Sequence, residues 1–133
     1  MTEISLVTVA KSAEVVAGTL YGLGIGWNWT PTPTPPIVLV VRADVPGSRL
    51  AGQELPITFA LEDSDGRPVP HGEPWVTVSD SPTLPDGQYV GVGVPLWMLV
   101  YFPPLDLAPG RYQFRVTCDD AERSYAFSVV APL

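Results

Sequence analysis

Apolar and polar residues alternate along most of this chain, as they do in β-strands with one buried face. The clearest example is RYQFRVTC, in which Tyr112, Phe114, Val116 and Cys118 alternate with polar residues. The stretch SYAFSVV repeats the pattern, and the polar DDAE between the two predicts a hairpin loop. By contrast, IVLVV at 37–41 has no polar position, so we expect a central strand that is covered on both faces.

The same alternation, with enrichment in β-branched and aromatic residues, predicts strands along the whole chain. Sixteen prolines and twelve glycines leave almost no room for a helix. Only KSAEVVAG, at 11–18, could hold a helical turn, and it could equally be an irregular crossing loop. We expect strands near 3–9, 19–27, 37–45, 55–62, 74–79, 88–94, 96–102, 111–118 and 123–130.

These elements predict an all-β fold: a single antiparallel β-sandwich, immunoglobulin-like or related, with about 7–9 strands and little or no helix. The turn residues agree, because Asp65-Gly66, Asp86-Gly87 and Pro109-Gly110 are hairpin or tight-turn pairs between the expected strands. We detect no internal repeat and no boundary, so residues 1–133 are expected to form one domain.

Two stretches resemble known proteins. The segment PPLDLAPGRYQFRVTCDDAERSYAFSVV resembles the last two strands of many immunoglobulin-like sandwiches, with a leucine-bearing segment, a glycine turn and a tyrosine that opens a strand. The front, SLVTVAKSAEVVAGTLYGLGIGW, is similar to an N-terminal pattern of a bacterial family of uncharacterised small β-sandwich proteins, with a strand of the form LYxLGxGW. That family also carries a DG hairpin like EDSDGRPV, and the resemblance implies a fold but no catalytic residues.

Composition and charge narrow the range of partners. Hydrophobic residues make up 46% and charged residues only 16%, which leaves little polar cover and favours oligomerisation. The net charge is −7, and the cations are Lys11 and six scattered arginines, so nucleic acid and anionic membranes are not expected partners. The apolar stretch at 94–105 is shorter than the ~20 residues of a membrane span and contains prolines.

The N-terminus and the cysteine usage bear on the compartment. Glu3 lies where a secretory signal would carry positive charge, and the neighbouring apolar residues alternate with polar ones. Cys118 is the single cysteine, so no internal disulfide can form and we expect a small buried residue there. We therefore predict a cytoplasmic protein.

The motifs with possible catalytic or metal chemistry are incomplete. In EDSDG the first and twelfth positions of a calcium loop would be Leu61 and Gly72, so a hairpin turn is expected instead. One histidine and one cysteine exclude a zinc site within one chain, and we expect His71 in an exposed loop. An enzyme with facing carboxylates has no supporting motif. We predict no enzymatic activity, no cofactor and no metal.

The stretch GLGIG at 22–26 is not a phosphate-binding loop, because its glycines occupy every second position and prolines follow instead of a helix. In a strand over 20–27, Gly22, Gly24 and Gly26 would form one bare face. Either another part of the protein approaches this face closely, or the face forms a shallow groove for a ligand or a partner.

The tryptophans and the proline-rich connector at 30–36 carry the remaining functional signal. TPTPTPP favours an extended polyproline-like path, which either lies on its own sandwich or reaches a neighbouring chain, and we favour the neighbour. Aromatic side chains beside polar groups mark contact surfaces. The candidate residues for contact with a ligand or partner are Trp27, Trp29, Trp97 and Tyr101.

Two hypotheses follow. The first is a non-catalytic structural or protein-interaction domain that forms a homo-oligomer or binds a protein partner. The alternative is a β-sandwich that binds carbohydrate or another small ligand through exposed tryptophans.

Overall fold

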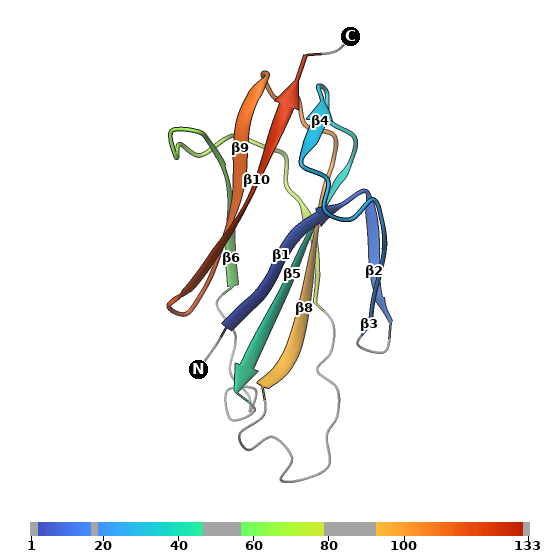
Figure 1. Cartoon of the computed structure of the whole chain (residues 1–133), viewed down its shortest axis with the longest axis vertical. Helices are drawn as coiled ribbons and strands as arrows, with labels where there is room; N and C mark the ends of the chain where they lie inside the picture. The colour runs from blue at the N-terminus through green and yellow to red at the C-terminus, as the bar shows by residue number, and fades with distance from the viewer. Residues whose placement is uncertain (1–2, 17–18, 47–56, 79–92, 132–133) are drawn as a thin grey trace.

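The computed structural model describes residues 3–16, 19–46, 57–78 and 93–131, and they form a sandwich of two four-stranded sheets with a small hairpin at its side (Figure 1). These residues contain ten strands and no helix, so none of them belongs to a helix that could cross a membrane. The strands are β1 (Glu3–Ala10), β2 (Ser12–Val16), β3 (Thr19–Leu23), β4 (Trp29–Pro31), β5 (Ile37–Pro46), β6 (Ile57–Asp63), β7 (Trp75–Val78), β8 (Gly93–Phe102), β9 (Gly110–Cys118) and β10 (Ala121–Val130).

Both sheets are mainly antiparallel, which confirms the predicted class of fold. The first sheet has the order β1-β5-β8-β7, and every pair in it is antiparallel. The second has the order β4-β10-β9-β6, in which only the short β4 runs parallel to its neighbour β10. The remaining two strands, β2 and β3, pair with each other as a separate hairpin.

The main core lies between the two sheets. Strand β9 buries Phe114, Val116 and Cys118 and exposes the Arg115 between them, as its alternation predicts. The Phe114 ring stacks on Phe127 of β10, with 5.4 Å between the ring centroids. The Phe114 ring also contacts Phe102 of β8, with 5.3 Å between the centroids, and this contact joins the second sheet to the first.

A second, smaller core lies on the outer face of the first sheet, beneath the β2–β3 hairpin. Val38 and Val40 of β5 pack there with Trp97 and Leu99 of β8, and all four are buried. The opposite face of β5 contributes Ile37, Leu39 and Val41 to the main core, so alternate residues of this apolar run enter the two cores. The prediction that IVLVV is covered on both sides is confirmed.

The segment KSAEVVAG forms strand β2 through Val16, and not a helical turn or a crossing loop. Its weak alternation has a physical basis, because Ala13 and Val15 face the second core while Ser12 and Glu14 are exposed. The Tyr101 hydroxyl of β8 donates a hydrogen bond to the Ala13 carbonyl over 3.1 Å. Packing and this bond hold the hairpin on the sheet.

The strand expected over 19–27 ends at Leu23, so the prediction of one bare glycine face is wrong. Gly24 and Gly26 have φ values of 61° and 81°, in the left-handed region that favours glycine, and they turn the chain out of the hairpin. Gly22 does permit a close approach, because an added Cβ would lie 2.9 Å from the Ile25 side chain.

Other boundaries also differ from the prediction. The expected strand at 96–102 is confirmed as part of β8, which extends over Gly93–Phe102, while most of the expected strand at 88–94 and the Asp86-Gly87 turn lie outside the described residues. The connector at 30–36 begins inside β4, where Thr30 lies opposite Val129 of β10.

The Asp65-Gly66 turn is built as its residues predict. One Asp63 carboxylate oxygen accepts backbone N–H bonds from Asp65 and Arg67, and Gly66 has a φ of 77°. At the start of β9, the Tyr112 hydroxyl donates to the Ala108 carbonyl over 2.7 Å, an arrangement known as a tyrosine corner.

Candidate interaction surface

The exposed apolar side chains lie mainly on three parts of the molecule: the β2–β3 hairpin, the start of the proline-rich connector, and strand β7. Trp75 of β7, Leu23 of β3 and Trp29 of β4 are the most exposed, at 71%, 72% and 62% of their surface. Large apolar residues at this exposure favour contact with another molecule. The full set in the described residues is Val16, Tyr21, Leu23, Ile25, Trp29, Trp75, Val76, Val78 and Val130.

The connector and the two tryptophans before it form a groove of about 580 Å³, which we call the Trp29 groove. Its surface is mainly apolar, and Lys11 is the one ionisable side chain among the described residues that line it. The residues that line it are Lys11, Trp27, Trp29, Thr30, Pro31, Pro33, Thr34 and Pro35.

The floor of the Trp29 groove is fixed by contacts within the chain. The Trp27 ring packs edge-on against Phe127 at 5.4 Å, and the Trp27 carbonyl accepts a hydrogen bond from the Tyr125 hydroxyl. Thr34 is buried, and it exchanges two hydrogen bonds of 2.9 Å with the backbone of Leu105. The connector therefore lies on its own sandwich, contrary to our expectation, while the Trp29 ring stays exposed.

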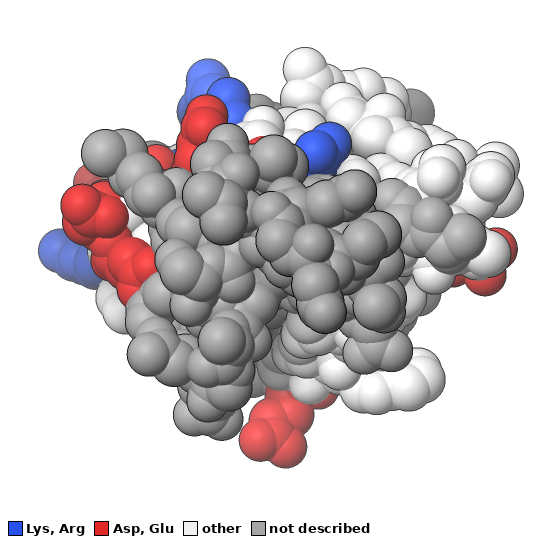
Figure 2. Space-filling view, turned by 90° about the horizontal axis from the view of Figure 1, so that it is seen from below, with Lys and Arg blue, Asp and Glu red and all other residues white. Residues whose placement is uncertain are grey.

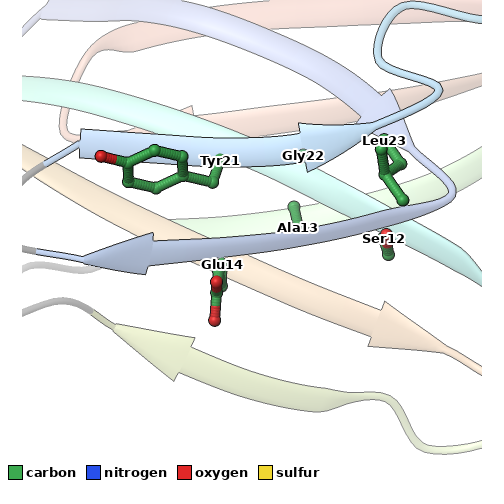
Figure 3. A pocket seen from close by; sticks show the side chains of 6 residues that line it. All are labelled: Ser12, Ala13, Glu14, Tyr21, Gly22 and Leu23. Atoms are coloured by element: carbon green, nitrogen blue, oxygen red, sulfur yellow. The ribbon is translucent and has the colours of Figure 1, made fainter.

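The second part of the surface is the outer face of the hairpin, shown in Figure 3. Tyr21 and Leu23 are exposed on β3, and Ser12 and Glu14 lie opposite them on β2. With Ala13 and Gly22 they line an open depression of about 500 Å³. The face combines a ring, an aliphatic side chain and a single carboxylate.

The third part is strand β7, at the edge of the first sheet. Trp75 packs against Tyr101 of β8, with ring centroids 5.6 Å apart. Between β7 and the hairpin lies a small cleft of about 230 Å³, lined in part by Tyr101, Trp97 and Val78. The cleft is too small for more than a side chain of a partner.

The structure separates the four predicted contact residues into two pairs. Trp27 and Trp29 share the Trp29 groove, whereas Trp97 and Tyr101 lie below the hairpin, at the cleft beside β7. Trp97 is only 8% exposed, packs in the second core and lies under the Arg42 guanidinium, 5.7 Å from it. Its burial argues against the predicted contact role, while the exposed Trp75 was not among the predicted residues.

The outer face of the second sheet differs in character, because it carries paired charges. Glu62 of β6 is 3% exposed and accepts bonds from Arg115 at 2.8 Å and from Gln113 at 2.9 Å. In Figure 2 charged side chains gather on the side of β6 and β9, and mostly uncharged atoms cover the side of the hairpin. Because its carboxylate already pairs with Arg115 and Gln113, Glu62 has a structural role.

The residues with possible catalytic or metal chemistry are dispersed. His71 is exposed, and one of its ring nitrogens lies 2.7 Å from the Gly72 carbonyl. Cys118 is buried within the core. Over 3–16, 19–46, 57–78 and 93–131, no group of three histidine, cysteine or acidic side chains is placed to hold a metal ion.

Comparison with known proteins adds no family to these observations. No protein-family model matches the chain, and a search of curated proteins finds no match either. The resemblance of the N-terminal segment to uncharacterised bacterial proteins stays a prediction.

Proposed function

We propose that this protein is a non-catalytic interaction domain with an immunoglobulin-like sandwich, and that it associates with itself. The strand order supports the immunoglobulin-like part. Constant-type immunoglobulin domains place their first, second, fifth and fourth strands in one sheet and their third, sixth and seventh in the other. The same order results here if β1 and β4 are two halves of the first strand, and β5 to β10 are the other six.

The exposure of Trp75, together with Leu23 and Tyr21, is the observation that carries the proposal of self-association. Each of these side chains lies on a regular strand, and a ring held on a rigid element loses little entropy when a partner covers it. A low share of charged residues, 16%, supports the same proposal because obligate and homomeric interfaces are depleted in charge.

The test is a measurement of molar mass by sedimentation or light scattering, from micromolar to millimolar protein. We expect a mass that rises with concentration towards that of a dimer. A mass equal to one chain over the whole range would contradict the proposal. The measurement should be repeated at high salt, where apolar association persists and ion-pair association weakens.

The Trp29 groove supports a second candidate function, the binding of a carbohydrate or another small ligand. Its volume of about 580 Å³ lies within the range of ligand sites, and an exposed tryptophan ring can stack on the apolar face of a sugar. Lys11 at the groove would favour a ligand that carries a carboxylate.

Fluorescence titration with neutral and uronic-acid oligosaccharides tests this candidate. If sugars bind in the groove, Trp29→Ala should weaken binding about 30-fold, corresponding to about 2 kcal/mol for a central ring. Trp75→Ala is the matched control, since it removes an equally exposed ring outside the groove. Equal loss in both variants, or no titration by any sugar, would refute the carbohydrate function.

We further propose a cytoplasmic location, supported by the single cysteine and its burial in the core. A chain with a single cysteine forms no internal disulfide and so needs no oxidising compartment. Burial also restricts the reactivity of the thiol. Fractionation of cells that express the full chain with a C-terminal tag is the corresponding measurement.

A further inference from the structure

The edges of the two sandwich sheets differ in how they are protected. An edge strand presents unpaired backbone N–H and C=O groups, and proteins block such strands with charges, bulges, prolines or covering loops. Among the described strands, the edges are β1 and β7 in the first sheet and β4 and β6 in the second.

Strand β1 is blocked by side-chain and backbone donors. Arg123 of β10 donates to the carbonyls of Ile4 and Ser5, at 3.2 and 2.6 Å. Further along, the Gly26 N–H donates to the Val9 carbonyl over 2.7 Å. A shift in the register between Ile4 and Leu6 also interrupts the ladder of this strand. A second strand cannot add to β1 without breaking these bonds.

In the second sheet, each edge strand is blocked by the segment that directly follows it. After β6 the chain turns back, so that the Val69 N–H donates to the Leu61 carbonyl and the Asp63 N–H to the Arg67 carbonyl. Strand β4 is only three residues long and ends at Pro31, which has no N–H to donate. Prolines continue beyond it through the connector.

Within its own four residues, strand β7 has none of these protections, and Glu73 and Pro74 lie before it, outside the strand. It pairs with β8 on one side, and no described residue pairs with its other side. Its sequence, WVTV, contains no charge, no proline and no glycine, and it is rich in the residues that favour strands. Three of its four side chains, Trp75, Val76 and Val78, are exposed.

We propose that two copies of this protein pair through β7, edge to edge and antiparallel, to form one continuous eight-stranded sheet. This inference rests on the proposed self-association and names the surface that produces it. Two chains of net charge −7 repel each other overall, so a second copy can bind only through an uncharged surface, and β7 provides one because WVTV contains no ionisable residue. Because a two-fold axis joins each β7 to its own counterpart, the pairing closes at a dimer.

The pairing also has a defined register. Residues opposite each other in an antiparallel ladder point to the same face, and a two-fold axis normal to the sheet keeps the faces of both copies aligned. Trp75 and Thr77 share the outer face with Tyr101 and Leu99, their partners on β8, whereas Val76 and Val78 point the other way. Two registers preserve this division while pairing most of β7: Val76 opposite itself, or Thr77 opposite itself.

The size of the contact sets its strength. A ladder of four residues, flanked by one exposed aromatic ring from each copy, falls short of the ~800 Å² per partner of a standard interface. We therefore expect a reversible dimer that dissociates on dilution, and not a permanent one.

Cysteine cross-linking tests the register in the full-length protein. Val76→Cys or Thr77→Cys should form an intermolecular disulfide under mild oxidation, because the Cα atoms of directly opposite residues lie within the reach of a disulfide. The native Cys118 is buried and serves as an internal blank. Thr19→Cys, at an exposed position on β3, is the matched control and should not cross-link.

Charge substitution tests the same edge without a cross-link. Val78→Lys should raise the dimer dissociation constant about tenfold, because a lysine on an edge strand opposes the addition of another strand. Val78 is already 56% exposed, so the melting temperature should stay close to that of the wild type. If that variant does not fold, Trp75→Lys replaces it at a site that is 71% exposed. Val130→Lys, on β10 at a site that is 39% exposed, is the control and should leave the dimer intact, while Tyr21→Lys tests whether the hairpin forms the interface instead.

The outcomes separate this inference from the proposed function. Cross-linking at Val76 or Thr77 with loss of the dimer in Val78→Lys would support pairing through β7. A wild-type dimer that survives Val78→Lys and cross-links only at Thr19, or dissociates only in Tyr21→Lys, would overturn the β7 pairing while self-association stands. A wild-type protein that remains a single chain at millimolar concentration would overturn both.

Discussion

Replacing Trp97 by alanine tests whether the β2–β3 hairpin is held by the second core. Trp97 is 8% exposed and packs under the hairpin with Val38, Val40 and Leu99. Removing a buried tryptophan costs about 3–5 kcal/mol from lost transfer energy and the cavity left behind. The contact with the Arg42 guanidinium at 5.7 Å adds about 0.5–1 kcal/mol. Against a domain stability of about 5–15 kcal/mol, the loss is large.

The loss should also be local. A two-stranded hairpin is marginally stable alone, and β2–β3 lies on the sheet through Ala13, Val15 and Leu20. Without Trp97, we expect the amides of β2 and β3 to exchange with solvent much faster, while the β9 and β10 amides keep their protection relative to the variant's global stability.

Denaturant titration gives the free energy of unfolding, and hydrogen exchange with mass spectrometry locates the change. Trp29→Ala is the matched control: its ring is 62% exposed, so we expect a change within about 0.5 kcal/mol. The reasoning would be refuted if Trp97→Ala cost no more than Trp29→Ala, or if exchange in the hairpin did not respond.

Four further substitutions test individual contacts and turns. Tyr101→Phe removes the hydroxyl bond to the hairpin and should cost about 0.5–1.5 kcal/mol in denaturant titration, with faster exchange in β2. Thr34→Val leaves the buried Leu105 N–H without its acceptor and should cost about 1–3 kcal/mol, measured as a lower midpoint of unfolding. Gly24→Ala and Gly66→Ala both force a side chain into positive φ, at about 1–2 kcal/mol each, and Gly24→Ala should melt lower because its added Cβ also meets a neighbouring side chain at 2.9 Å.

Strong periodicity made the C-terminal half of the sandwich predictable. In β9 every second residue is apolar, so both the strand and its buried face follow from the sequence. Strand β5 was predictable for the opposite reason, because a run without polar residues requires cover on both sides. In each case a local pattern carries the information.

Strands β2 and β4 were missed because their local signals are weak. In β2 the inward-facing positions are a small alanine and a single valine, both only partly buried, and this apolar face is covered only once the hairpin packs on the sheet. Strand β4 has only three residues and ends in Pro31. A strand that contains proline fits at the edge of a sheet, and β4 lies there, parallel to β10. Both strands depend on tertiary contacts between distant segments.

The exposure of the tryptophans could not be predicted for a related reason. The segment LWMLVYF in β8 is apolar on both faces, so its sequence does not reveal which face the hairpin covers. Trp97 falls beneath the hairpin, whereas Trp75, one strand further out, is left exposed. Placement of the hairpin, and not residue type, therefore separates a core residue from a contact residue.

The hairpin links this placement to the proposed dimer. Strand β2 lies against β5 and β8 and ends short of β7, with only the small cleft between them. Tyr101 joins the two regions, because its hydroxyl donates to Ala13 of the hairpin and its ring packs on Trp75 of β7. Loosening the hairpin should make the Tyr101 ring mobile. The Trp75 ring that packs on it should then lose its fixed orientation. If pairing through β7 uses Trp75 in its present position, Tyr101→Phe should weaken the dimer less than Trp97→Ala, because only the second removes the packing beneath the hairpin.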